Sequence, residues 1–386
     1  MKYNFDDLAD LRNNSFSRYS EVTSGQLSMS IADMDFKVLP EIREALKKRI
    51  DIGAFGYLDV PEGFYCAFID WERKRHNIEV SREWLLFSTS VIASIDCIFS
   101  RFSKPNDGIV MFTPIYNTFY SCIHNHDLKL FPCPFMEKSN NYEINFSLLE
   151  KILSKNDIKI FLLANPHNPG GKIFTKEEIN KIVMLAKKYN VLLISDEIHS
   201  DIIISDTDYT SLIDSFNEYK NIIVLNSASK SFNLAGMQAS IVIVKDLNLR
   251  TSLSKELYKN DVGEPNCLGV FASSTAWTHG LEWNKQLCYY LKQNLDIINS
   301  YNFAKFGLYL ISGGATYLLW FKVPSNFKDG EHFQKSFFKE ESILISSGFI
   351  FGKEGINHIR INIASSKKNI IRLCESLERF LAKYSN

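Results

Sequence analysis

Short runs of apolar, mostly β-branched residues recur through the middle of the chain, between about residues 84 and 245. The runs are WLLF (84–87), GIVMF (108–112), IKIFLLA (158–164), VLLIS (191–195), IIVLN (222–226) and ASIVIV (239–244). They are almost continuously apolar, which is typical of strands buried on both faces of a parallel sheet. The pattern therefore predicts a mostly parallel central sheet.

A helical pattern lies between two of these runs, in TKEEINKIVMLAKKYN (175–190). It begins with a capping box from Thr175 to Glu178, carries apolar residues at helical spacing, and ends in Lys187 and Lys188. Strands that alternate with such helices predict an α/β fold in which helices cover both faces of the sheet.

The pattern changes after about residue 282. Two long helical segments (282–302 and 367–386) flank two strand-like runs, ATYLLWFKV (315–323) and HIRINIA (358–364). A further helix is predicted over PEIREALKKRI (40–50). We therefore expect three regions: an N-terminal segment (1–45) that is part of the small domain, a large domain (46–282), and a small C-terminal α+β domain (283–386).

Composition and charge exclude several classes of protein. The 386 residues contain 44 Lys and Arg and 44 Asp and Glu, which argues against binding to nucleic acid or an anionic membrane through bulk charge. The start, MKYNFDDLAD, lacks the apolar core of a signal peptide, and no apolar run approaches the roughly 20 residues of a membrane span. Seven scattered cysteines without a C-x-x-C pair favour reduced thiols and a cytoplasmic location.

Polar residues follow four of the predicted strands. Asn165 to Pro169 follows IKIFLLA, Asp196 to His199 follows VLLIS, and Lys230 follows IIVLN by a short loop. Ser88 to Ile92 follows WLLF and opens a helix-like segment. Because ligands bind at the carboxyl ends of strands in open α/β sheets, these groups are expected around one crevice.

This set of groups has a chemical logic. A helix N-terminus favours an anion such as phosphate, and a carboxylate at a strand end can hold a cationic ring nitrogen. A partly desolvated lysine near another cation becomes a nucleophilic amine that can form a Schiff base. Phosphate, ring nitrogen and aldehyde together describe pyridoxal 5′-phosphate. Neither His199 nor the pair His124 and His126 shows the ligand spacing of a zinc site, so no metal is expected.

Three segments, ANPHNPGGKIFTKEE, ISDEIHSD and SASKSFNLAG, occur in this order and resemble the fold-type I aminotransferases. More narrowly, they resemble the MalY/PatB-type cystathionine β-lyases, the C–S lyase branch. The same branch is similar to this chain at IADMDFKVLPEIREALKKR, FGYLDVPEGF, WTHGLEW and IRINIA. The resemblance spans nearly the whole chain and implies the fold type I architecture, with a mostly parallel sheet between helices and a smaller α+β domain.

The resemblance also implies roles around the cofactor ring. Lys230 would be the Schiff-base lysine and the general base at the substrate Cα. Asp196 would pair with the ring nitrogen, and Asn168 would bind the phenolic oxygen and contact the substrate. Tyr116 would stack on the ring and assist catalysis. His199 is expected nearby, as part of the cofactor's surroundings.

Other residues would hold the phosphate and the substrate. Arg360 would bind the substrate carboxylate through a bidentate pair. Tyr57 resembles a tyrosine that reaches the phosphate and the substrate from the neighbouring subunit, which implies a homodimer with shared active sites. The remaining phosphate contacts would come from two serines and from three residues at a helix N-terminus: Ser227, Ser229, Ser90, Val91 and Ile92.

Plainer interpretations of these residues exist. Asp196 alone could be a helix cap, Tyr57 and Tyr116 could be core aromatics, and Arg360 could form a surface ion pair. The chain also departs from the family pattern where Ser90 stands in place of glycine and where Asn117 stands in place of proline. Serine tolerates positive φ poorly, so phosphate binding at Ser90 requires a turn without positive φ.

The resulting hypothesis is a pyridoxal phosphate-dependent C–S β-lyase that converts a sulfur amino acid to pyruvate, ammonia and a thiol. The main alternative is a class I/II aminotransferase, which uses nearly the same residues. Gln238, eight residues after Lys230, stands where many aminotransferases carry a phosphate-binding arginine, and the lyase branch is similar to this chain there. A third hypothesis is a cofactor-binding regulatory scaffold that acts through a protein partner.

Overall fold

The computed structural model describes residues 2–311 and 313–384. Its largest sheet has the strand order β2-β10-β9-β8-β7-β3-β4. All neighbouring pairs are parallel except those made by β10, which is antiparallel to both β2 and β9. The predicted mostly parallel sheet is thus confirmed. The strands are β2 (Leu85–Ser88), β3 (Gly108–Thr113), β4 (Lys129–Pro134), β7 (Ile158–Ala164), β8 (Leu192–Asp196), β9 (Ile222–Asn226) and β10 (Ser240–Ile243).

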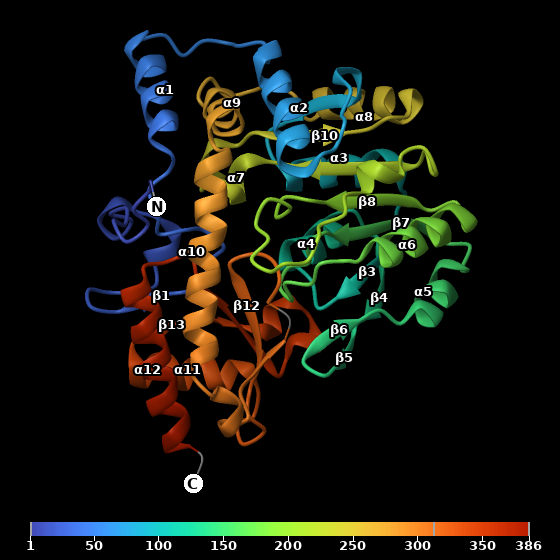
Figure 1. The fold of residues 1–386 in the computed structure, drawn as a ribbon. Coiled ribbons are helices and arrows are strands. Elements are labelled where there is room, and N and C mark those ends of the chain that lie inside the picture. The colour runs from blue at the N-terminus through green and yellow to red at the C-terminus, as the bar shows by residue number, and fades with distance from the viewer. Residues whose placement is uncertain (1, 312, 385–386) are drawn as a thin grey trace.

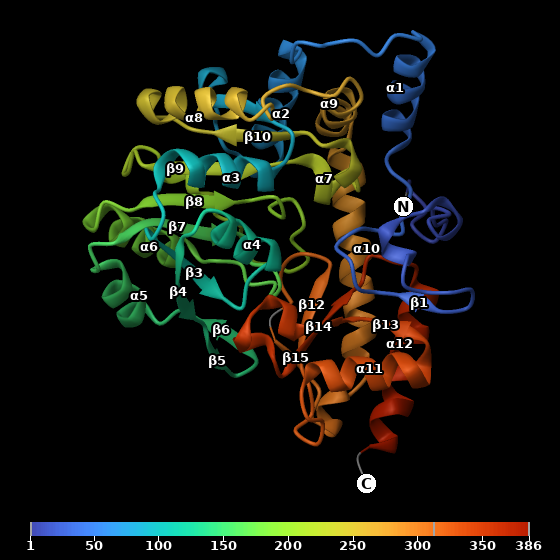
Figure 2. The same ribbon diagram turned by 180° about the vertical axis from the view of Figure 1, so that it is seen from behind.

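Helices cover both faces of this sheet (Figures 1 and 2). Along β3, Met111 belongs to one hydrophobic core and Phe112 to the other, because successive side chains of a strand point to opposite faces. One face packs against α3 (Val91–Phe102), α4 (Asn117–Asn125) and α8 (Leu247–Lys259). The other packs against α2 (Glu62–His76), α5 (Phe146–Leu153), α6 (Lys176–Lys188) and α9 (Gly269–His279).

Several element boundaries differ from the sequence prediction. IKIFLLA and IIVLN match β7 and β9, whereas β8 is shifted by one residue and ends at Asp196. The edge strand β4 was not predicted, because its sequence KLFPCP contains two prolines, which are restricted to sheet edges. The antiparallel direction of β10 was not predicted either, because a strand buried on both faces is apolar throughout whether it runs parallel or antiparallel to its neighbours.

The predicted helices are present with small shifts. In α6, the Thr175 hydroxyl accepts from the Glu178 N–H, and the Glu178 carboxylate accepts from the Thr175 N–H, so the predicted capping box is confirmed. α1 (Pro40–Asp51), α10 (Leu281–Ser300) and α12 (Lys367–Lys383) correspond to the other three predicted helices. The last two positions of the final predicted helix, 385 and 386, lie outside the described residues.

A smaller unit lies below the large sheet in Figure 1, and α10 runs from one unit into the other. Its sheet has the order β11-β12-β15-β14. The elements are β11 (Tyr309–Ile311), β12 (Leu318–Lys322), β13 (Ile343–Leu344), β14 (Ser346–Ser347), β15 (His358–Asn362) and α11 (Gly330–Glu341). A separate hairpin is formed by β5 (Met136–Lys138) and β6 (Asn141–Glu143).

The N-terminal segment is joined to this smaller unit. β1 (Leu27–Ser28) pairs in parallel with β13. The buried Arg18 Nε donates to Asp35 Oδ1 at 2.7 Å and closes the segment on itself. The carbonyls of Ile31 and Asp33 accept from Arg18 and Asn362. These contacts fix residues 31–35 against Arg18 and β15, and from the large unit Lys230 Nζ donates to the Ala32 carbonyl. No helix in the described ranges is both long and apolar enough to cross a bilayer.

Candidate active site

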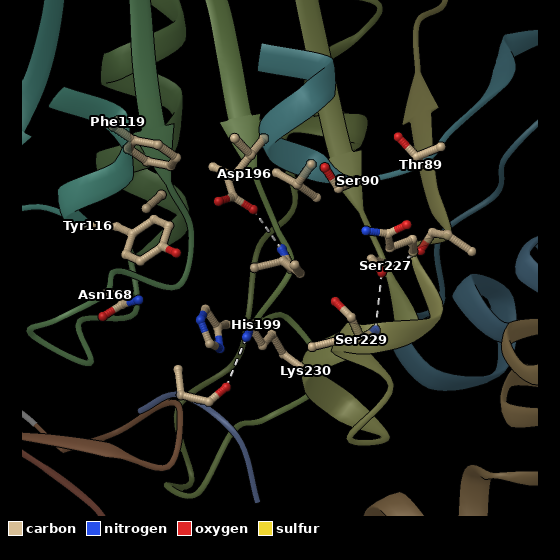
Figure 3. A pocket seen from close by; sticks show the side chains of 18 of the residues that line it. Thr89, Ser90, Tyr116, Phe119, Asn168, Asp196, His199, Ser227, Ser229 and Lys230 are labelled. Atoms are coloured by element: carbon tan, nitrogen blue, oxygen red, sulfur yellow. Dashed lines mark hydrogen bonds between the residues drawn. The ribbon is translucent and has the colours of Figure 1, made fainter. Parts of the chain in front are cut away.

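A cavity of about 170 Å³ lies at the carboxyl ends of the parallel strands (Figure 3). The topology explains its position, because the ends of β7, β8 and β9 meet at one edge of the sheet. Ten residues predicted from the sequence line it together: Ser90, Val91, Ile92, Tyr116, Asn168, Asp196, His199, Ser227, Ser229 and Lys230.

Lys230 lies in the short helix α7 (Ala228–Ser231) that follows β9. Its Nζ donates to the Ala32 carbonyl at 2.9 Å and lies 3.9 Å from Asp33 Oδ1. Burial lowers the pKa of the Lys230 ammonium, and the charge of Arg360 lowers it further. Asp33 and Asp196 raise it, but the pKa stays below that of an ordinary lysine. The side chain therefore releases its proton more readily than an exposed lysine, as a nucleophile or base requires.

Asp196 ends β8 and is almost completely buried. Its Oδ1 accepts the N–H of Ile198 at 3.1 Å. Burial raises the pKa of this carboxyl to about 7, against the lowering effect of that N–H. A cation bound beside it would favour the ionised form.

The N-terminus of α3 opens into the cavity. Ser90 is the N-cap, and its hydroxyl accepts from the Ala93 N–H at 3.1 Å. The N–H groups of Val91 and Ile92 belong to the first turn, where no carbonyl of the helix can accept from them. Ser90 has φ −160°, which is extended backbone, so its turn does not require a glycine. This geometry suits an anion such as a phosphate.

Ser227 is the N-cap of α7, a position that the sequence did not predict. Its hydroxyl accepts from the Ser229 N–H at 3.1 Å and donates to the Ala239 carbonyl at 2.7 Å. The single proton of this hydroxyl is therefore already donated to a backbone carbonyl. The predicted contact with a phosphate stays a prediction for both serines.

Arg360 reaches the site from β15, in the smaller unit. Its Nη1 donates to Asn168 Oδ1 at 3.2 Å and its Nη2 to the Ser30 carbonyl at 2.9 Å. The side chain is buried, and its Nε has no partner among the described residues. Burial lowers the pKa of the guanidinium to about 10, so it stays charged at neutral pH. Arg360 does not line the inner cavity; it lines an adjoining outer one together with Tyr116 and Lys230.

His199 is a buried, neutral side chain that lines the inner cavity. Burial, and then the charges of Lys230 and Arg360, lower the pKa of its imidazole to about 3. Its Nδ1 is buried without a hydrogen-bond partner in the part of the chain that the structure describes. A buried polar atom without a partner is costly, so the fold places this imidazole at the cavity at some cost in stability.

These features together fit pyridoxal phosphate. The first turn of α3 suits its phosphate, Asp196 suits its ring nitrogen, and Lys230 suits its aldehyde. His199 lines the same cavity, so its imidazole would contact a ligand bound there. By contrast, no group of three or more metal-ligating side chains occurs in residues 2–311 and 313–384.

Tyr57 lies apart from the cavity. It is fully exposed, in the connection between α1 and α2. Within one chain it does not line either cavity. Its predicted contact with the phosphate therefore requires a second subunit and stays a prediction.

The structure also brings in residues that sequence reasoning did not select. Asp33 and the Ala32 carbonyl face Lys230 from a segment almost 200 positions away. Asp201 accepts from Trp71 Nε1 at 2.9 Å and from the Ser231 hydroxyl at 2.7 Å, and lies 2.8 Å from His76 Nε2. Because Ser231 follows Lys230, this buried carboxylate ties the lysine-bearing turn to α2. Asp33 and Asp201 both stand inside segments that resemble the family, but nothing in their spacing indicated a partner.

Comparison with known proteins agrees with this geometry. The family model for class I and II aminotransferases matches residues 24–377. Cystathionine β-lyase PatB of Bacillus subtilis is 30% identical over 361 residues, which cover 93% of this chain and 92% of PatB. A pyridoxal phosphate-bound C–S lyase from Staphylococcus hominis superposes with a TM-score of 0.89 at 28% identity, covering 99% of both chains. A pyridoxal phosphate-bound protein from Clostridium difficile, described as a putative aminotransferase, superposes with a TM-score of 0.90 at 32% identity, covering 100% of this chain and 99% of that one.

Proposed function

Since the chain belongs to the class I and II aminotransferase family, within its pyridoxal phosphate-dependent C–S lyases, we propose that it is a C–S β-lyase. The reaction would split an amino acid that carries sulfur on Cβ into pyruvate, ammonia and a thiol. The observation that carries the proposal is the position of Lys230. It lines the inner cavity with the cofactor-binding groups and the outer cavity with Arg360.

Each side chain of the site has its own role in the proposed reaction. Arg360 binds the α-carboxylate of the substrate through its guanidinium, which holds Cα near Lys230. The Lys230 amine accepts the Cα proton, as its lowered pKa allows. Bound pyridoxal phosphate supplies an electron sink for the pair left on Cα. Asp196 would hold the ring nitrogen in its positively charged form, and Tyr116 would pack on the ring. Thiolate then leaves Cβ, and the remaining three-carbon amine hydrolyses to pyruvate and ammonia.

The test is direct. Purified holoenzyme is incubated with L-cystathionine and with L-cysteine, and both pyruvate and thiol (or sulfide) are measured. Lys230→Ala should abolish product formation and the visible absorption of the lysine-bound cofactor. Lys339→Ala, at an exposed lysine on α11, serves as the matched control and should keep both. A fully loaded wild-type enzyme that releases neither product would refute the proposal.

An aminotransferase is the second candidate, because one of the similar structures is described as a putative aminotransferase. Its reaction would return the proton to the cofactor instead of expelling sulfur. Gln238 lines the inner cavity; the sequence interpretation places it where many aminotransferases carry a phosphate-binding arginine, which counts against this candidate. Amine transfer to pyruvate or 2-oxoglutarate at a rate above that of thiol release would favour this candidate.

The quaternary structure and location complete the proposal. Apolar residues are exposed at the end of α1 and in the connection that carries Tyr57: Ile50, Ile52 and Phe55 are between 51% and 60% exposed. A partner subunit would cover them, and we propose a cytoplasmic homodimer in which Tyr57 contacts the partner's site. A monomeric mass in sedimentation equilibrium would contradict the shared site.

A further inference from the structure

The outer cavity has a volume of about 520 Å³ and shares Ala32, Tyr116 and Lys230 with the inner one. Arg360 lines it, with a buried Nε that has no partner among the described residues. If Arg360 holds the substrate carboxylate and Lys230 faces Cα, the substrate side chain extends into this cavity. The chemistry of its wall therefore selects among sulfur amino acids.

The charges in the wall are unbalanced. Among the described residues that line the cavity, Lys230 and Arg360 are the only cations, and the proposed reaction uses both. Two carboxylates, Glu21 and Glu331, line the same cavity. Glu331 pairs with Lys335 at 2.6 Å, but both side chains are about half exposed or more, so water screens the pair. A second carboxylate on the substrate would meet like charges and no free cation.

Apolar side chains form another part of the wall. Phe349 and Ile350 line the cavity and remain 58% and 45% exposed. Leu344 and Ile345 add buried apolar surface beside them. An apolar group that covers these side chains removes their surface from water, which strengthens binding by roughly fourfold for each methylene buried.

From these features we propose that the outer cavity is a subsite for an uncharged, apolar substituent on the substrate sulfur. The preferred substrates are then S-alkyl or S-aryl cysteines, and S-carboxymethyl-L-cysteine, whose side chain ends in a carboxylate, is a poorer one. This inference rests on the proposed C–S lyase function, and its test separates the two.

Binding is measured first, with holoenzyme and with ligands that have no leaving group on Cβ. L-Homophenylalanine carries an apolar side chain and L-2-aminoadipate a carboxylate, and each is titrated by the change in cofactor absorption. We expect L-homophenylalanine to bind at least about tenfold more tightly. Turnover of S-benzyl-L-cysteine and S-carboxymethyl-L-cysteine, followed by pyruvate release, should show the same order in kcat/KM.

Variants assign the preference to the wall. Ile350→Ala should weaken L-homophenylalanine binding about threefold or more relative to L-2-aminoadipate, whereas Ile371→Ala, an isoleucine of similar exposure on α12, should leave this ratio as in the wild type. Glu21→Gln combined with Glu331→Gln should strengthen L-2-aminoadipate binding about twofold to fivefold, less so in high salt.

The results decide between the two proposals. Tighter binding of L-2-aminoadipate, or equal effects of Ile350→Ala and Ile371→Ala, would overturn the subsite. If the binding preference holds but no sulfur substrate releases pyruvate, the subsite stands and the lyase function fails.

Discussion

Asp33→Asn offers a quantitative test of how the site controls its lysine. The substitution keeps the shape of the side chain and removes the carboxylate that lies 3.9 Å from Lys230 Nζ. Asp33 raises the pKa of the Lys230 ammonium, against the lowering effects of burial and Arg360. Removing the carboxylate therefore lowers this pKa further, and more of the reactive free amine is present at any given pH.

The size of the effect follows from the geometry. Two unit charges about 4 Å apart interact by about 4 kcal/mol at an effective dielectric constant of 20 and by about 1 kcal/mol in water. The two side chains are 22% and 29% exposed, so we take a value of about 1–2 kcal/mol. Because one pKa unit corresponds to about 1.4 kcal/mol, the pKa of Lys230 should fall by about one. Asp196 and Arg360 act equally in both proteins.

The assay labels the cofactor-free protein with a trace of an amine-reactive reagent over a pH series, and the Lys230 peptide is quantified by mass spectrometry. The labelling midpoint should move to lower pH in Asp33→Asn. Asp296→Asn removes a carboxylate 3.6 Å from another lysine, Lys292 on α10, and should leave the Lys230 midpoint in place. An unchanged or higher midpoint in Asp33→Asn would refute the assignment of Asp33 as the charge partner of Lys230.

Three further substitutions test the proposed substrate-binding arginine and two residues that stabilise the fold. Arg360→Lys should raise KM by about tenfold or more with an unchanged cofactor spectrum, because an ammonium cannot make the bidentate pair; an unchanged KM in steady-state kinetics would remove Arg360 from substrate binding. Asp201→Asn should cost about 2–4 kcal/mol in urea unfolding at neutral pH, because it breaks a buried pair with His76. Burial would raise the pKa of the Asp201 carboxyl, but the bonds from His76 and other donors hold it below normal. The Asp201 carboxylate therefore stabilises the fold fully above its unfolded-state pKa, and this stabilisation is lost as the pH falls through its folded-state pKa. The difference in unfolding free energy between variant and wild type should shrink in acid; a difference that is constant with pH would count against this. Gly171→Ala should destabilise by about 1–2 kcal/mol, because Gly171 has φ +63° and a Cβ there would lie 3.0 Å from the Ala315 carbonyl oxygen; wild-type stability in the same urea titration would disprove the strain.

Much of the framework follows from local sequence. The apolar runs 158–164 and 222–226 predicted β7 and β9 to the residue, because a strand buried on both faces must be apolar throughout. The capping box at Thr175 specified the start of α6, since both of its hydrogen bonds lie within four residues. The polar groups after β7, β8 and β9 predicted a shared crevice, because parallel strands end at one edge.

Other features depended on segments far apart in the chain. Nothing local indicated that the Ala32 carbonyl and Asp33 would face Lys230, since any carbonyl can accept a hydrogen bond and its partner is chosen by packing. The contact between Arg360 and Asn168 spans 192 positions and joins the two units.

The chain alone therefore determined the strands, the caps and the kinds of group in the crevice, because these depend on burial and on hydrogen bonds between near neighbours. Only the tertiary structure decided which charges surround Lys230 and which side chains line the outer cavity. The field at a buried amine depends on distances of a few ångströms between residues that the sequence leaves far apart.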